Sequence, residues 1–481
     1  MAARSKNQNR WLPPLTFLIS LIVLYFATMP LLDDPDVPWH IAAGKLMLAT
    51  HELPASDPWS FATHGTPWYN LSWWWDIKLA VIESIAGLLG VFVFAMACSA
   101  ALLAFLAWAL LRRGIALQAV MLTLFIAAFC MLEFATARPQ LAGYGLVLLF
   151  AVLLHESRRN DRVLFFLPLL MILWVNMHGS FIAAFTVLGA YIIDGYTAKN
   201  KRWRRKLIAV TLACAVCTLA NPYGMHIYKG IMTTMDSVAR DLIAEWQPLY
   251  IGKSIGLSVW LLAFALGSNI KNARATLADK ILAFFWLICT LTAARNGAIF
   301  MFLSAPYVAA CIDEQSRNIR EPLSIPAWLE QKSALFLWMK SIILAVFFIA
   351  VVSAFPHDNR IESAQHSARD AIEYAFKHYP NHHFLTDYNL GGQVIYDTDG
   401  KLPMFMDSRA GTAYSEQSIA DYADFLTLHP GWEDKINAYG VNAILLGNNQ
   451  DFARAYAQGF YQDEWKLVFA GKAASVYISA P

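Results

Sequence analysis

The chain has 481 residues, of which 57% are hydrophobic and only 15% are charged, with a formal net charge of +2. Soluble domains carry about 25% charged residues, so this deficit argues against a soluble protein and predicts an integral membrane protein. The small net charge, with its Lys and Arg grouped between apolar runs, argues against nucleic acid as a partner. All six cysteines fall inside apolar runs, which is typical of small packing residues and not of a disulfide set.

Apolar runs recur along residues 1–355 and predict about eleven transmembrane helices, the first of them an uncleaved span. Clusters of Lys and Arg fall in alternate connections. By the positive-inside rule this pattern predicts a cytoplasmic N-terminus and an extracytoplasmic C-terminus. The expected spans cover residues 11–32, 88–111, 115–135, 141–156, 163–177, 180–196, 206–220, 254–270, 280–294, 297–313 and 333–355.

Three carboxylates and a histidine follow the first span directly, at Asp33, Asp34, Asp36 and His40. A charged group at the centre of a bilayer costs roughly 2.5–3.5 kcal/mol. These side chains are therefore expected at the water interface or in a polar cavity. The prolines that lie between them disfavour a helix, so we expect the acids on a loop with fixed turns.

The first external loop, residues 33–87, also carries amphipathic and aromatic stretches. Residues 41–50 and 77–85 are expected to form short helices that lie along the membrane surface. The three consecutive tryptophans at 73–75 are typical of an interfacial anchor, which is the simpler interpretation for at least two of them.

Later helices end in polar groups on the same expected external face. Arg138, His178 and Arg295 are the basic members of this set, and Glu245 is an acidic one. Taken singly, each fits a helix end, a hydrogen-bonded packing histidine or an arginine that extends to the interface. The inner connections carry mostly plain Lys and Arg. The gathering of unusual groups on one face therefore favours a shared site.

Residues 356–481 are more polar and predict a small extracytoplasmic α/β domain. Strands are expected at 383–388, 393–396, 404–406, 441–446, 465–470 and 474–478, with helices at 362–378, 416–428 and 451–458. The sequence Asp407-Ser408-Arg409 follows one of these strands. It fits either a substrate contact or, more simply, an ion pair within a loop.

Carboxylates at the mouth of a membrane helix can serve three purposes. They can bind a divalent cation, act as a general base on an acceptor, or form an ion path in a transporter. Arginine matches the oxygens of a phosphate well, so Arg138 and Arg295, with His178, are candidates to neutralise a departing phosphate. A base beside a cationic phosphate site is what sugar transfer from a lipid phosphate requires.

The order of these motifs resembles the GT-C superfamily of integral-membrane glycosyltransferases, and most closely a bacterial GT-C-like group. The similarity covers most of the chain. The matching motifs are Asp34-Pro35-Asp36-x-x-Trp39-His40, Leu53-Pro54-x-x-Asp57-Pro58, Arg138-Pro139, Asn176-x-His178-Gly179, Asn221-Pro222-Tyr223-Gly224, Glu245-Trp246, Arg295-Asn296, Gly391-Gly392 and Asp407-x-Arg409.

The resemblance implies a fold, a reaction and a set of residues. The fold would be a polytopic helical bundle in the bacterial cytoplasmic membrane, and the donor a polyprenyl-phosphate sugar lipid. The acceptor would be a glycan, a lipid or a protein. The catalytic acid falls on Asp36, with Asp34 as its neighbour, and both as ligands of Mg²⁺ or Mn²⁺. The common Asp-Glu or Glu-x-Asp form is missing, so base and ligand roles can be exchanged. Substrate contacts are expected at His40, Asp57, Arg138, His178, Glu245 and Arg295.

Two other classes of function remain open. A transporter or flippase would move a lipid-linked or anionic solute, but it would carry charges or broken helices at mid-membrane on several spans, and only Glu133 is such an acid here. A non-catalytic scaffold of the cell envelope would present the α/β domain to partners. Release of a labelled sugar from its lipid carrier separates an enzyme from both.

Overall fold

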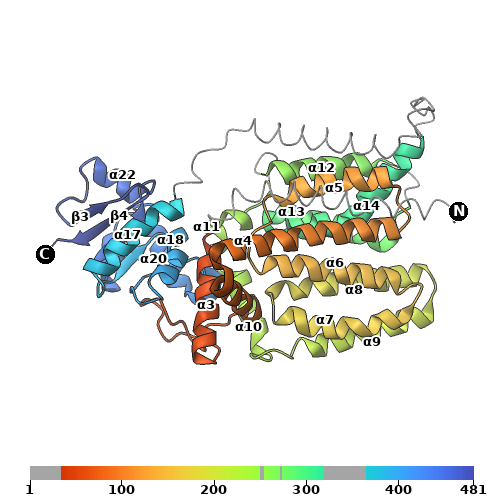
Figure 1. Ribbon diagram of the computed structural model, residues 1–481, viewed down its shortest axis with the longest axis horizontal. Coiled ribbons are helices and arrows are strands. Elements are labelled where there is room, and N and C mark those ends of the chain that lie inside the picture. Colours follow the sequence, from red (N-terminus) through yellow and green to blue (C-terminus); the bar gives the residue numbers. More distant parts are fainter. Residues whose placement is uncertain (1–33, 250–253, 271–273, 319–363, 481) are drawn as a thin grey trace.

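The computed structural model describes residues 34–249, 254–270, 274–318 and 364–480. A bundle of helices runs along the long axis of the molecule, and a small domain with a β-sheet lies at one end of the bundle (Figure 1). The expected spans at 11–32 and 333–355 lie outside the described residues, as does Asp33.

Helix α3 and the first part of α4 lie in the segment 33–87, which was expected to be the first external loop, and the two helices pack closely together. Helix α3 is Asp36–Thr50, and helix α4 is Trp73–Arg112 with a break at Gly87, where φ is 64°. Gly87 therefore separates the short helix expected at 77–85 from the span expected at 88–111. The acids were expected on a loop, but Asp36 is the first residue of α3. A proline is tolerated in the first turn of a helix, where its missing N–H has no helical partner.

Most of the remaining helices coincide with the expected apolar runs, but many of them are short, and α10, α11 and η4 lie between the runs expected at 206–220 and 254–270. The remaining helices are α5 (Leu117–Met131), α6 (Gln140–Glu156), η2 (Asp161–Phe165), α7 (Phe166–Val175), η3 (Gly179–Ile182), α8 (Ala183–Thr197), α9 (Lys201–Cys217), α10 (His226–Asp236), α11 (Ala239–Leu242), η4 (Ala244–Trp246), α12 (Ile255–Ser268), α13 (Leu277–Thr292), η5 (Ala294–Asn296) and α14 (Gly297–Asn318).

The prediction of about eleven spans is not supported. Within the described residues, three helical segments are long and apolar enough to cross a membrane, namely Trp73–Arg112, Gly179–Thr197 and Ala294–Arg317. A hydrocarbon core about 30 Å thick needs about 20 helical residues at 1.5 Å each. Helix α7 has 10 residues and α12 has 14, so hydropathy placed these helices well and overstated their length.

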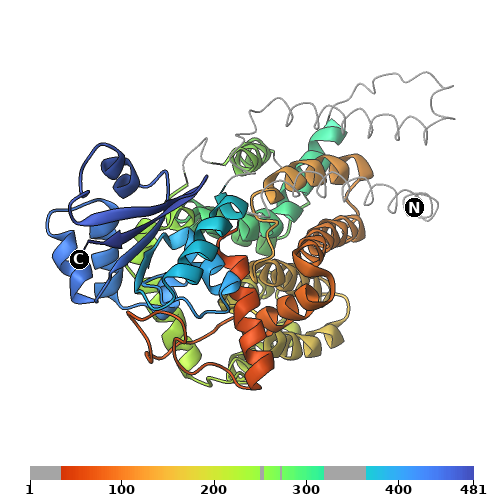
Figure 2. The ribbon, with the colours of Figure 1, turned by 60° about the vertical axis from the view of Figure 1, so that its left-hand side comes forward.

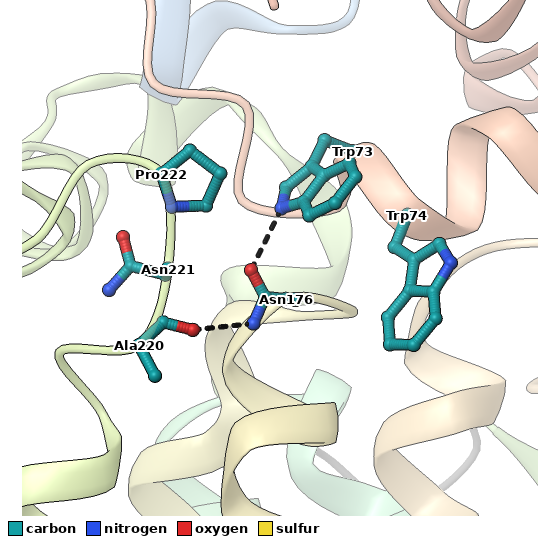
Figure 3. A pocket seen from close by; sticks show the side chains of 6 residues that line it. All are labelled: Trp73, Trp74, Asn176, Ala220, Asn221 and Pro222. Atoms are coloured by element: carbon teal, nitrogen blue, oxygen red, sulfur yellow. Dashed lines mark hydrogen bonds between the residues drawn. The ribbon is translucent and has the colours of Figure 1, made fainter.

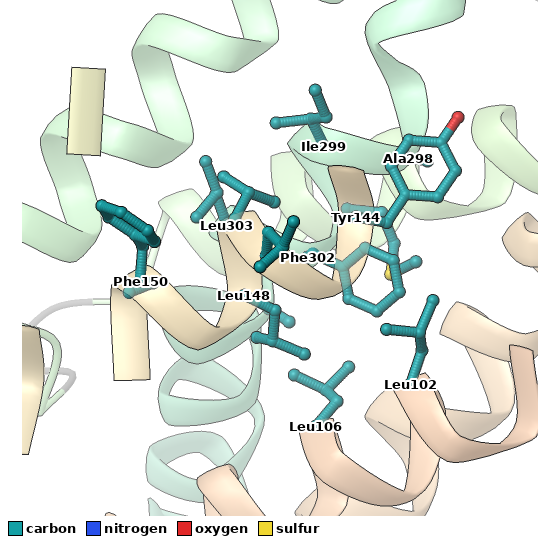
Figure 4. Packing of buried hydrophobic residues seen from close by; sticks show 14 of the residues in the cluster. Leu102, Leu106, Tyr144, Leu148, Phe150, Ala298, Ile299, Phe302 and Leu303 are labelled. Atoms are coloured by element: carbon teal, nitrogen blue, oxygen red, sulfur yellow. The ribbon is translucent and has the colours of Figure 1, made fainter. Parts of the chain in front are cut away.

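The bundle buries an apolar core between α4, α6 and α14. Leu102 and Leu106 of α4 face Tyr144 of α6, and Phe302 and Leu303 of α14 pack from the other side (Figure 4). Large apolar side chains also lie on the outside of the bundle at helical spacing, for example Ile208, Leu212 and Val216 on α9. Exposed apolar stripes of this kind are typical of a surface that contacts lipid.

The basic connections meet at the end of the bundle that lies away from the sheet domain. Arg113 follows α4 and pairs with Asp279 of α13 at 2.7 Å, and Arg158 follows α6 and pairs with Asp194 of α8 at 2.6 Å. Helix α6 begins next to Arg138 and ends next to Arg158, so the polar groups around Arg138 lie at the opposite end. The basic connections and the polar groups around Arg138 therefore lie at opposite ends of the bundle.

The C-terminal domain contains a mixed four-stranded sheet of order β1-β2-β4-β3, with β1 parallel to β2 and the other pairs antiparallel. Its elements are α17 (Ala364–His378), β1 (Phe384–Thr386), α18 (Tyr388–Asp397), α19 (Ala410–Ala413), α20 (Glu416–Leu426), α21 (Trp432–Ala438), β2 (Ala443–Gly447), α22 (Asp451–Ala457), β3 (Trp465–Ala470) and β4 (Ala474–Ser479).

Two of the strands expected in this domain are not present as full strands. Residues 393–396 lie inside helix α18, because a short apolar run fits either a strand or a buried helix face. Met404 forms isolated parallel bridges with Phe384 and Ser60 and not a full strand. The other four expected strands and the three expected helices are present, with ends shifted by a few residues.

The segment 33–87 packs against the C-terminal domain as well as the bundle. Helix α3 lies against α18 (Figure 2). The hydroxyl of Ser60 donates to the carbonyl oxygen of Phe405 at 2.6 Å, and Trp39, Trp59 and Trp68 belong to the same apolar core as the sheet. The segment 33–87 therefore joins the two halves of the molecule.

Candidate functional site

Arg138 lies at the centre of three carboxylates that come from distant parts of the chain. Its Nε donates to both oxygens of Asp34, at 2.8 and 2.7 Å. Its Nη1 lies 3.0 Å from an oxygen of Asp36 and 3.3 Å from an oxygen of Glu245. The side chain of Asp34 is almost fully buried, whereas Asp36 keeps 18% of its surface and Glu245 keeps 38%. The accessible side of this cluster is therefore formed by Asp36 and Glu245.

Arg295 extends the cluster by one more charge. Its Nη1 lies 3.5 Å from the second oxygen of Glu245, and its guanidinium group lies over the ring of Trp246 at 3.9 Å. Glu245 therefore bridges two arginines. We call Asp34, Asp36, Arg138, Glu245 and Arg295 the Arg138 cluster.

Local sequence explains how the members of the cluster are held. The carboxylate of Asp34 accepts the backbone N–H of Asp36, and Trp39, one turn further along α3, donates its indole N–H to Asp36. Arg138 precedes Pro139, which is the N-cap of α6. Glu245 and Arg295 lie on single turns of 3-10 helix, η4 and η5. Every member is thus fixed at the end of a helix, where chain direction changes.

Burial and charge set the ionisation of the cluster. Burial raises the pKa of Asp36 above its usual value, and Asp34 adds to this, while Arg138 and His40 work against it. Burial alone would lower the pKa of Arg138, but Asp34, Asp36 and Glu245 together raise it well above its usual value. Arg138 is therefore a permanent cation, and Asp36 retains its proton more readily than an ordinary aspartate does.

His40 is fully enclosed beside the cluster and is paired with an acid that the sequence did not single out. Its Nδ1 lies 2.7 Å from a carboxylate oxygen of Asp76 near the start of α4, and its ring stacks on Trp39 at 3.6 Å. Asp76 is completely buried, and it also accepts hydrogen bonds from the side chains of Asn70 and Ser72.

His178 is neutral, which does not suit the cationic role expected for it. Burial lowers the pKa of His178 to about 3, with a further contribution from Arg295 and His40. Its Nδ1 accepts the backbone N–H of Ser180 and caps the turn η3. Because Nδ1 is an acceptor, the ring proton lies on Nε2. His178 can therefore donate a hydrogen bond, whereas the positive charge of the site comes from the arginines.

Asp57 belongs to a second ion cluster and not to the one around Arg138. Its carboxylate accepts from Nη2 of Arg409 at 2.9 Å, and Arg409 also binds Asp407 at 2.6 Å. All three side chains are fully buried, and the guanidinium lies 4.6 Å from the ring of Trp59 and 4.7 Å from the ring of Trp68. Of the two interpretations of Asp407 and Arg409, the ion pair is what the structure has. The trio attaches the segment 33–87 to the C-terminal domain.

Oxygen donors of the kind that Mg²⁺ and Mn²⁺ prefer are present in the Arg138 cluster, but in this arrangement they do not fit a metal ion. The guanidinium of Arg138 occupies the space between Asp34, Asp36 and Glu245. In the described part of the chain, no three His, Cys, Asp or Glu side chains are placed to hold a metal. The metal role of Asp34 and Asp36 stays a prediction, and no step below uses it.

The C-terminal domain contributes residues to this region that sequence reasoning missed. The hydroxyl of Ser408 donates to the carbonyl oxygen of Pro35 at 3.3 Å, and the hydroxyl of Tyr388 donates to the carbonyl oxygen of Ser408 at 3.0 Å. Burial raises the pKa of Tyr388 well above its usual value, with Asp36 as a further cause. A Cβ at Gly392 would overlap the oxygen of Pro35. The paired glycines at 391–392 were the available signal for this close approach.

An open pocket lies on the same end of the bundle, where α4 meets the loops after α7 and α9 (Figure 3). Asn176 accepts the indole N–H of Trp73 at 3.1 Å and donates to the carbonyl oxygen of Ala220 at 2.8 Å. Its amide thus joins three segments, which is the structural role of a helix-end asparagine. Of the three tryptophans, Trp75 is buried and Trp74 is exposed. The pocket is lined by Trp73, Trp74, Asn176, Ala220, Asn221 and Pro222.

Comparison with known proteins does not place the chain. A scan against models of protein families finds no matching family. A search of curated proteins finds no relative.

Proposed function

We propose that the chain is a membrane glycosyltransferase that moves a sugar from a polyprenyl-phosphate carrier to an acceptor on the extracytoplasmic face. The acceptor is a hydroxyl or amine of a glycan, a lipid or a protein. One observation supports this most. A single guanidinium, Arg138, holds a partly accessible acid, Asp36, within 3.0 Å, and a second arginine lies one carboxylate away.

The proposed step needs one base and one anion site. The oxygen or nitrogen of the acceptor attacks the anomeric carbon of the sugar while Asp36 takes its proton. The bond between the anomeric carbon and the phosphate oxygen breaks, and its electron pair leaves with the lipid phosphate. Arg138 and Arg295 stabilise that negative charge, because a guanidinium matches phosphate oxygens in geometry and stays charged. His178 donates a hydrogen bond and adds no charge.

The raised pKa of Asp36 suits a general base. A carboxylate of ordinary pKa holds a proton too weakly to accept one efficiently near neutral pH, and partial burial corrects this. The same burial predicts that the acidic limb of the pH–rate profile lies at higher pH than an ordinary aspartate would give. Because the charged form of Asp36 is disfavoured, replacing it with Asn is expected to leave the fold intact.

The test is transfer by membranes that contain the full chain. Radiolabelled polyprenyl-phosphate sugars are supplied, and label released from the lipid fraction is measured. Asp36→Asn is expected to lower transfer by about 100-fold or more, the range that a general base contributes. Asp399→Asn is the matched control, because Asp399 is 75% exposed and lies in the C-terminal domain. Unchanged transfer by Asp36→Asn would remove it from the mechanism. Movement of intact lipid across the membrane, with no bond cleaved, would show that the chain is a transporter and not an enzyme.

A further inference from the structure

We propose that the carboxylate of Glu245 occupies the position of the donor's phosphate in the substrate-free cluster and is displaced when the donor binds. The inference rests on the proposed transfer reaction and deepens it. Glu245 thereby sets a threshold for anion binding. Free phosphate does not reach that threshold, whereas a phosphate carried by a membrane lipid does.

Glu245 bridges the two arginines that the proposed reaction assigns to the departing phosphate. One of its oxygens lies 3.3 Å from Nη1 of Arg138, and the other lies 3.5 Å from Nη1 of Arg295. A phosphate also presents several oxygens, each of which can pair with a guanidinium group. The carboxylate of Glu245 and the phosphate of a donor therefore compete for the same two cations.

Of the three acids in the Arg138 cluster, Glu245 is held least firmly. Asp34 lies 2.7 Å from Nε of Arg138 and also accepts a backbone N–H. Asp36 lies 3.0 Å from Nη1 of the same arginine and also accepts the indole N–H of Trp39. Glu245 has the longest contacts and the most exposed side chain, and within the described residues its carboxylate is paired with the two arginines only. It is therefore the acid that another anion displaces most easily.

Displacement of Glu245 leaves the two arginines in place. Arg138 remains bound to Asp34 through Nε, and Arg295 remains over the ring of Trp246, at 3.9 Å. The backbone need not move, because the side chain of Glu245 is 38% exposed and can turn toward solvent about its own bonds. The cluster is thus a preformed anion site that is covered by one of its own side chains.

A carboxylate that belongs to the chain is a strong competitor for dilute anions. Its effective concentration beside the arginines is on the order of millimolar or higher, because a short tether keeps it there. Every phosphate must compete with it, so the dissociation constants of free and lipid-linked phosphate are raised alike. A lipid chain offsets this effect, since it anchors the phosphate in the membrane and concentrates it at the bilayer surface. Free phosphate has no such gain.

Net charge is the competing explanation, because the loss of any acid near the site favours an anion. Asp236→Asn removes one negative charge at the end of α10, where the side chain is exposed and belongs to no ion pair of the described residues. Glu245→Asp keeps the charge and shortens the side chain, so it cannot reach both arginines at the same distances. Occupancy therefore predicts tighter phosphate binding by Glu245→Asp, whereas net charge alone predicts none.

The experiment measures the binding of two probes, inorganic phosphate and polyprenyl phosphate, to the full chain in phosphatidylcholine vesicles. Glu245→Gln is expected to lower the dissociation constant of each probe by about tenfold or more, because the phosphate gains a charge-assisted hydrogen bond. Glu245→Asp is expected to lower both constants by a smaller factor. Asp236→Asn is expected to change them by less than about twofold, because salt screens an exposed charge. Thermal unfolding verifies that each variant is folded.

Transfer kinetics give a second readout. The KM for the sugar donor is expected to fall about tenfold in Glu245→Gln, since the carboxylate opposes donor binding and takes no part in the chemical step. A fall in kcat of about 100-fold would instead identify Glu245 as an acid–base residue and overturn the inference.

The binding results can also overturn the inference. Weaker phosphate binding by Glu245→Gln would show that the carboxylate supports the anion site and does not occupy it. Equal gains for Glu245→Gln and Asp236→Asn, or no gain for Glu245→Asp, would leave net charge as the explanation. If wild type releases no sugar from its lipid, the proposed function fails, but the phosphate affinities still decide whether Glu245 holds the position of an anion.

Discussion

The buried ion cluster of Asp57, Asp407 and Arg409 predicts how firmly the segment 33–87 is attached to the C-terminal domain. All three side chains have no exposed surface, and Arg409 donates to both acids. Arg409→Met keeps the length of the side chain and removes its charge. Two carboxylates would then remain in an apolar core with no cation. Removing one partner of a buried ion pair costs about 3–5 kcal/mol, because the remaining charge is left uncompensated.

The size of the effect can be measured by thermal unfolding. A loss of 3–5 kcal/mol lowers the melting temperature of a domain of this size by roughly 10–20 °C. Trp59 and Trp68 both lie within 5 Å of the guanidinium, so their fluorescence reports opening at the cluster itself. Adding Asp57→Asn and Asp407→Asn to Arg409→Met is expected to recover part of the loss.

Arg369→Met is the matched control for this experiment. Arg369 pairs with Asp397 at 3.2 Å in the same domain, but its side chain is 42% exposed. Exposed pairs contribute about 0–1 kcal/mol, so this variant is expected to melt within a few degrees of wild type. Equal melting temperatures for the two variants would refute the reasoning, because burial would then make no difference to the cost of losing the arginine.

Three further outcomes are expected. Gly392→Ala places a Cβ on the oxygen of Pro35 and should cost about 1–3 kcal/mol of stability, whereas Gly189→Ala, with open space around it, should stay within about 0.5 kcal/mol in the same melting assay. His178 is neutral when folded and gains a proton when unfolded below pH 6.5, so stability should fall as the pH drops from 6.5 to 5, by up to about 2 kcal/mol, and His178→Gln should lack that loss in pH-dependent melting. Mn²⁺ is expected to leave the melting of substrate-free wild type unchanged and to stabilise Arg138→Gln, in which three carboxylates have lost their cation. Stabilisation of wild type by Mn²⁺ would mean that the metal displaces Arg138 from between the three carboxylates.

The positions of the helices could be predicted from the sequence because apolar periodicity is a local property. The run at 141–156 became α6, which is Gln140–Glu156. Helix length was less readable, since apolar residues continue through turns such as η2 and η3 that tertiary packing imposes. The strand expected at 393–396 failed for a related reason. Asp387 caps a helix there, and that signal lies outside the apolar run itself.

The members of the Arg138 cluster were recognised as unusual residues, but their pairing was beyond a sequence. Arg138 and Asp34 are 104 residues apart, and Arg409 and Asp57 are 352 apart. Both arginines lie at the start of a helix, so nothing local distinguishes a site residue from one that joins two parts of the fold. Asp76 was missed because it is one acid beside a tryptophan run, and its partner His40 lies 36 residues earlier.

The charge balance of the Arg138 cluster limits what it can accept and gives a last prediction. Three carboxylates and two guanidinium groups leave one net negative charge when all are ionised. A lipid phosphate would add another, which like charges oppose. The proton held by Asp36, whose pKa is raised, removes this obstacle.

Donor binding should therefore favour protonated Asp36, whereas base catalysis needs the carboxylate. Asp36→Asn imitates the protonated form, so it is expected to bind a polyprenyl phosphate more tightly than wild type although its sugar transfer is lower by about 100-fold or more. Binding is measured at several pH values with vesicles that contain the lipid phosphate, and wild type should approach the affinity of the variant as the pH falls. Weaker binding by Asp36→Asn at every pH would show that Asp36 contacts the donor directly, and the assignment of the arginines as its anion site would have to be given up.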